Sequence, residues 1–85
     1  MRVLAVQPIY GSHQGGTEVH IVAMSIGEMG NVFCRFGINI VVGTVIAKNE
    51  IYCVSPMAEA SARVGIFIAF GKSDFIPLNA TFEIV

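Results

Sequence analysis

The stretch 64–70 reads VGIFIAF, and its alternation decides the fold class. The four even-numbered positions are all large and apolar, whereas the odd-numbered ones carry two small residues and Phe67. Because successive side chains of a β-strand point to opposite sides, this pattern predicts a strand with one side packed into a core. We expect a central strand here.

The same period of two recurs at residues 18–23, 31–36 and 80–85. The predicted inward side chains of these strands are Val19, Ile21, Ala23, Val32, Cys34, Phe36, Phe82 and Ile84. Turn residues interrupt the chain at 11–16, 25–30, 48–49, 55–56 and 71–74. Short strands punctuated in this way predict an antiparallel β-sandwich, and residues 57–63 are too few for more than a short helix or loop.

The composition predicts one compact domain. The chain has 85 residues, of which 54% are hydrophobic and 13% are charged, which excludes intrinsic disorder and leaves more apolar surface than a small core needs. No apolar run reaches the roughly 18 residues of a membrane-spanning helix, so we expect no direct membrane insertion. We expect residues 1–85 to be a single domain of a longer multidomain protein.

The charge distribution disfavours nucleic acid as a partner. The formal net charge is -1, and the five bases are spread along the chain, at Arg2, Arg35, Lys48, Arg63 and Lys72. Proteins that bind nucleic acid gather bases into a patch or stripe. We therefore expect no nucleic-acid binding.

The glycine-rich stretch 10–17, YGSHQGGT, predicts a turn and not a phosphate-binding loop. A phosphate loop needs a lysine or a following helix, whereas Gly15 and Gly16 lead into a strand with no lysine nearby. Gly11, Gly15 and Gly16 are better explained by positive backbone dihedrals at a tight reversal.

No arrangement of residues points to catalysis, a metal or a cofactor. His13 lies in the glycine turn and His20 on an outward strand side, and neither has an orienting partner in the sequence pattern. Neither histidine has metal-ligand spacing to Cys34 or Cys53, and two cysteines alone do not form a structural zinc site. We therefore predict a non-enzymatic protein without a cofactor.

An ordered set of residues resembles the IPT/TIG domain family over nearly the whole chain. The set is Pro8-x-x-Gly11-x-x-x-Gly15-Gly16-Thr17-x-Val19-x-Ile21, Val32-x-Cys34-x-Phe36-Gly37, Ile51-x-Cys53-x-Ser55-Pro56, Val64-x-Ile66-x-Ile68 and Phe82. The resemblance implies an immunoglobulin-like β-sandwich of about seven antiparallel strands. It also implies that Gly15-Gly16-Thr17 lies where the first strand crosses to the second.

Cys34 and Cys53 are either a disulfide or two buried free thiols. Both fall on an inward parity, and a bridge would close a loop of about twenty residues and stabilise the fold by roughly 3 kcal/mol. The resemblance favours the disulfide, because extracellular members of the family carry a similar C-x-F-G and C-x-S-P pairing. A disulfide would in turn indicate an oxidising compartment.

Asn79-Ala80-Thr81 matches the acceptor pattern for N-glycosylation. The parity that buries Phe82 and Ile84 turns Asn79 outward. The triplet has meaning only if the chain is secreted in a eukaryote, and then it predicts a glycoprotein.

Apolar side chains on the outward parity predict a contact surface. Val22, Phe33 and Phe67 lie opposite the core positions, as do Tyr52 and Val54 if Cys53 points inward. Large contiguous apolar patches are uncommon on a lone domain. We therefore expect these residues to contact a neighbouring domain, another protein or another copy of the chain.

Two main classes of function remain open, and a third is an additional alternative. The first is a non-catalytic extracellular interaction or spacer module of a larger cell-surface or secreted protein, as the resemblance to receptor IPT domains implies. The second is an intracellular DNA-binding or dimerisation domain of the Rel-like kind, for which the sequence offers no basic loop. The third is an accessory sandwich of a carbohydrate-active enzyme.

Overall fold

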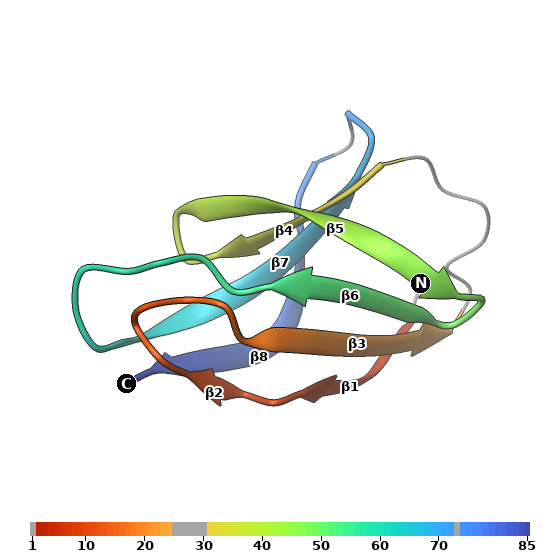
Figure 1. Ribbon diagram of the computed structural model, residues 1–85. Helices are drawn as coiled ribbons and strands as arrows, with labels where there is room; N and C mark the ends of the chain where they lie inside the picture. The colour runs from red at the N-terminus through yellow and green to blue at the C-terminus, as the bar shows by residue number, and fades with distance from the viewer. Residues whose placement is uncertain (1, 25–30, 73) are drawn as a thin grey trace.

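The computed structural model describes residues 2–24, 31–72 and 74–85, and within them it contains strands and no helix (Figure 1). The strands are β1 (Arg2–Gln7), β2 (Tyr10–Gly11), β3 (Glu18–Met24), β4 (Val32–Phe36), β5 (Asn39–Ala47), β6 (Glu50–Val54), β7 (Ala62–Phe70) and β8 (Ile76–Ile84). The predicted all-β class is confirmed. Among these residues no helix is long and apolar enough to cross a membrane.

The eight strands form one curled sheet in the order β1-β3-β6-β5-β4-β7-β8-β2. β5 is shared between two partners, because residues 39–43 pair with β4 and residues 44–47 pair with β6. The sheet bends along β5, so that β3 and β6 lie on one side of the molecule and β4, β7 and β8 on the other (Figure 1).

A disulfide between Cys34 of β4 and Cys53 of β6 crosses β5. In a flat sheet, two strands that flank a third lie about 9.5 Å apart. The Cα atoms of Cys34 and Cys53 are only 6.5 Å apart, within disulfide reach, because the sheet bends at β5. Gly43 leaves the room for this crossing, since a Cβ atom there would lie 2.9 Å from the Cys53 Sγ and 3.2 Å from the Cys34 Sγ.

The N-terminal segment pairs with two different strands. β1 is antiparallel to β3, and beyond Pro8 and Ile9 the short β2 is parallel to β8. Pro8 has no N–H group to donate, which suits the point where the segment leaves one partner strand for the other. The arrangement thus differs in two respects from the predicted one of about seven antiparallel strands. It has eight strands, and one pair is parallel.

Most buried side chains have the predicted parity, but Ala69, on the other parity of β7, is buried as well, and Val64 and Phe70 are only half-buried. All the inward residues predicted for β3, β4 and the end of β8 are buried, as are Ile66 and Ile68 of β7. Ile51, Cys53 and Leu78 join them in one continuous cluster, in which the Phe36 and Phe82 rings meet edge to face with centroids 5.2 Å apart. Because the cluster draws on both sides of the curled sheet, burial of this apolar surface holds the two sides together.

Turns and loops occupy the predicted positions that the structure describes, except that Gly11, in the predicted turn 11–16, belongs to β2. Residues 48–49 link β5 to β6, residues 55–56 follow β6, and residues 71–72 follow β7. The predicted turn at 25–30 and position 73 lie outside the described residues. Residues 57–61 form a loop, and β7 begins at Ala62, so the stretch 57–63 contains no helix.

The three turn glycines have two different physical causes. Gly15 and Gly16 have φ of 83° and 86°, which confirms the prediction of positive backbone dihedrals. Gly11 does not have a positive φ, so the same prediction is wrong there. It is a buried residue of β2, where a Cβ atom would run into the Thr17 hydroxyl and the Phe82 ring. Close packing, and not a turn, requires glycine at position 11.

Gly43→Ala should destabilise the oxidised chain by about 1–3 kcal/mol, because the new methyl group would contact both sulfur atoms. In a Cys34→Ala/Cys53→Ala background these contacts are gone, so the cost should fall by about 1 kcal/mol or more. Urea denaturation of the four chains measures the coupling. Gly65→Ala is the control, since its Cβ would meet only the Phe67 ring. Equal costs of Gly43→Ala in both backgrounds would contradict the crossing.

Candidate interaction surfaces

The predicted contact residues lie on two separate outer faces. Val22 of β3, and Tyr52 and Val54 of β6, lie on one side of the curled sheet, whereas Phe33 of β4 and Phe67 of β7 lie on the other. Val54 is exposed and the other four are half-buried. The structure therefore does not bring the five together into a single surface.

Polar side chains interleave with the apolar ones on the β3–β6 face. His20 lies opposite Tyr52, Val22 opposite Glu50, and Val54 opposite Glu18 in the β3–β6 pairing. The His20 Nδ1 lies 2.7 Å from the Glu50 Oε2, and the His20 and Tyr52 rings meet edge to face at 5.5 Å. This face is a mixed polar surface and not an apolar patch.

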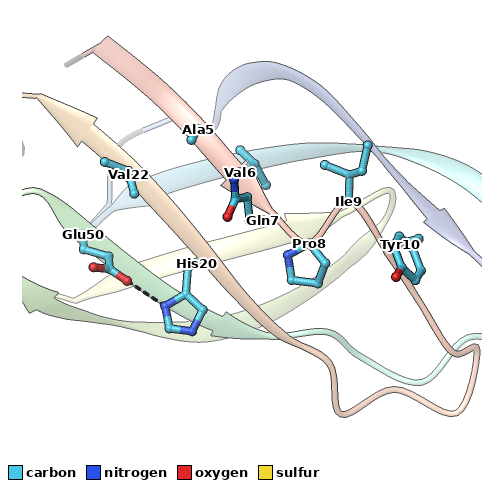
Figure 2. Close-up of a pocket in the computed structure, with 9 residues that line it drawn as sticks. All are labelled: Ala5, Val6, Gln7, Pro8, Ile9, Tyr10, His20, Val22 and Glu50. Carbon is cyan, nitrogen blue, oxygen red and sulfur yellow. Dashed lines mark hydrogen bonds and ion pairs between the residues drawn. The ribbon is translucent and has the colours of Figure 1, made fainter.

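An open groove of about 980 Å³ runs along the N-terminal segment beside the His20–Glu50 pair (Figure 2). Its lining residues are Ala5, Val6, Gln7, Pro8, Ile9, Tyr10, His20, Val22 and Glu50. The lining is mostly apolar, and Figure 2 shows the hydrogen bond between the His20 ring and the Glu50 carboxylate at one side of the groove.

Both histidines have hydrogen-bond partners, contrary to the prediction that neither would have one, although His13 is exposed and His20 is half-buried. The His13 Nδ1 lies 3.0 Å from the Val85 carbonyl oxygen, while Glu50 orients the His20 ring. An imidazole held by a carboxylate is one element of a general base. The pair joins β3 to β6, and its side chains are 40% and 34% exposed, so it acts as a partly solvated cross-strand contact.

The outer face of β4, β5 and β7 is much more apolar. In the strand pairings Phe33 lies opposite Val42, and Arg35 lies opposite both Ile40 and Phe67. These five side chains take the parity opposite to Cys34, and Phe75, just before β8, reaches the same cation. We call Phe33, Arg35, Ile40, Val42, Phe67 and Phe75 the Arg35 face.

The Arg35 guanidinium lies over two aromatic rings. Its Cζ is 4.0 Å from the centroid of the Phe67 ring and 4.9 Å from that of Phe75, distances at which a cation is attracted to the ring faces. The Nε is buried and has no hydrogen-bond partner. Within the described part of the chain no carboxylate forms an ion pair with Arg35.

The outer side of β5, which the sequence reading did not assign, carries the most exposed apolar residues of this region. Val42 is 71% exposed and Ile40 is 55% exposed, and Ile38, in the turn before β5, is 91% exposed. The alternation of Ile38, Ile40 and Val42 was the available signal. It was obscured because Val41 and Val45, on the inner side, are apolar too.

The remaining predicted site residues, the two cysteines and Asn79, are not part of the two contact surfaces. Cys34 and Cys53 form the core disulfide. Asn79 is exposed on β8, with a φ of 57°, at an irregularity in the pairing of β7 with β8. Left-handed backbone of this kind is tolerated by asparagine better than by most residues. Across the described ranges, no three His, Cys, Asp or Glu side chains gather to hold a metal ion.

Glu50→Gln should change the free energy of unfolding by less than about 1 kcal/mol, because partly exposed ion pairs contribute little. Urea denaturation checks this, with Glu18→Gln on the same face of β3 as the control. A loss of several kcal/mol, specific to Glu50, would mean that the His20–Glu50 pair carries far more of the stability than its exposure indicates.

No protein-family model and no curated protein matches this sequence. The resemblance to IPT/TIG domains therefore stays a prediction that rests on the residues quoted for it. The basis for a functional proposal is the geometry of the two outer faces.

Proposed function

We propose that this chain is a non-catalytic interaction or spacer module of a larger extracellular or cell-surface protein, and that the Arg35 face is where it contacts its neighbour. The observation that carries the proposal is the exposure of Ile40 and Val42 on a strand that also borders Phe33 and Arg35. Contiguous exposed apolar side chains of this kind mark interaction surfaces in folded domains.

The fold proposed for this module is an immunoglobulin-like β-sandwich of the IPT/TIG kind. Support comes from the single core that lies between β3 and β6 on one side and β4, β7 and β8 on the other. Further support comes from the position of Cys34 and Cys53, which resemble the paired cysteines of extracellular family members and are joined here. Such a module carries its interactions on its outer faces.

The disulfide supports an extracellular location. Structural disulfides form and persist in oxidising compartments and are rare in the cytosol. The bridge is fully inside the core, since Cys34 and Cys53 are 0% and 1% exposed. Burial of this kind is typical of a structural bridge and not of a thiol pair that reacts with solutes.

Secretion from eukaryotic cells should add an N-glycan at Asn79, because both Asn79 and Thr81 are exposed on β8. Mass spectrometry before and after enzymatic removal of N-glycans measures this. Thr81→Ala should abolish the glycan without altering the left-handed residue, and Asn49→Gln, outside any acceptor triplet, should leave it unchanged. A secreted, disulfide-bonded chain without a glycan would remove this part of the proposal.

Hydroxyl-radical footprinting tests the contact surface directly. In the longer protein on the cell surface, oxidation of Phe33, Phe67 and Ile40 should fall several-fold relative to the isolated chain, because a neighbour covers them. Exposed Tyr10 and Met57, which lie off the Arg35 face, should oxidise equally in both. Equal oxidation of the Arg35 face in the two samples would contradict the proposed function.

A further inference from the structure

We infer that Arg35 binds a carboxylate from a partner protein, carried on an extended segment with apolar side chains on both sides of the acidic residue. This inference rests on the proposed function, since it names the partner chemistry of the same face. It assigns to Arg35 the role of the polar anchor within an otherwise apolar contact.

The Arg35 guanidinium has no carboxylate acceptor within the described residues. Its Cζ lies over the Phe67 and Phe75 rings, and the buried Nε has no hydrogen-bond partner, so one N–H has lost its water without gaining a hydrogen bond. The terminal nitrogens are not among the buried unpaired atoms. A carboxylate that approaches end-on would accept from both terminal nitrogens at once, which is the strongest form of this contact.

The surroundings of Arg35 select an apolar partner. Ile40 lies directly opposite Arg35 on one side and Phe67 on the other, with Val42 and Phe33 forming the next cross-strand pair. A partner segment that covers Ile40 and Val42 removes their apolar surface from water and excludes water from the ion pair beside them. Arginine and aromatic residues at the centre of such a contact are the usual carriers of binding energy.

Charge complementarity disfavours a symmetric contact between two copies through β4, β5 and β7. β4, β5 and β7 contain no acidic residue, and their only charged residues are Arg35 and Arg63. A second copy that docked the same face would bring no carboxylate from these strands to Arg35. The carboxylate comes from outside these three strands, and the source proposed here is a heterologous partner.

The number of charges on the Arg35 face also favours a peptide over a nucleic acid as the partner. A nucleic-acid backbone is bound by several bases that neutralise several phosphates. One cation on an apolar face, in a chain of net charge -1, matches a single carboxylate. The groove beside His20 is a weaker candidate, because Glu50 already accepts the hydrogen bond of its histidine.

The test is an NMR titration of the ¹⁵N-labelled oxidised chain with two capped probe peptides, acetyl-Leu-Asp-Phe-Val-amide and its Asn counterpart. The Asp peptide should shift the Arg35 Nε–H resonance together with the amides of Ile40 and Val42. It should bind about tenfold more tightly than the Asn peptide, because charged hydrogen bonds contribute more than neutral ones. Added salt should narrow the difference.

Variants test whether the preference for the Asp peptide depends on Arg35. Arg35→Gln should remove the preference for the Asp peptide, and Arg63→Gln, the matched control on β7, should keep it. Arg35→Lys should retain part of it, because the charge remains while the planar fork is lost. If Arg35→Gln fails to fold, the comparison of the two peptides on the unaltered chain still decides the inference.

Several outcomes would overturn it. The inference fails if the two peptides bind equally, or if neither binds at millimolar concentration. It also fails if the shifts are centred on the His20 groove. The same shifts with acetate alone would show an adventitious anion only. If footprinting shows the Arg35 face covered while the peptides bind equally, the proposed function stands and the carboxylate inference fails. If the Arg35 face is never covered, the proposed function fails instead.

Discussion

The bridge from Cys34 to Cys53 over Gly43 is the contact on which the shape of this sheet depends. It joins two strands that are not neighbours in the ladder, and it does so only because β5 lies between them without a side chain at the crossing. The bend at that point lets the two sides of one curled sheet share a common core.

Much of the core could be predicted from the sequence, because β3, β4 and β7 each bury one parity and expose the other. Alternation in such strands reports directly which side chains face inward. β5 gave no such signal, since residues 39–47 carry apolar side chains on both parities. Its register, the parallel pairing of β2 with β8 and the reason for glycine at position 11 depend on contacts between distant segments, which local patterns do not specify.

The surfaces were less predictable than the core for the same reason. Outward parity identified Phe33 and Phe67 correctly as apolar residues of an outer face. Only the register of β4 with β7, however, places Arg35 opposite Phe67. In the sequence Arg35 is one of five scattered basic residues. In the fold its guanidinium lies over the Phe67 and Phe75 rings on an apolar face. His20 and Glu50 are likewise joined across thirty positions by the β3–β6 pairing.

The parallel pairing of β2 with β8 affects how the domain responds to mechanical tension. Parallel neighbours pulled from opposite ends slide along each other, so the backbone bonds from Glu83 to Ile9 and from Val85 to Gly11 are loaded together and not one after another. Part of the resistance to stretching would therefore come from the β2–β8 pairing, beside that from the longer pairing of β1 with β3. Once these pairings separate, the disulfide would still keep the loop between Cys34 and Cys53 from lengthening, which limits how far the opened chain could extend.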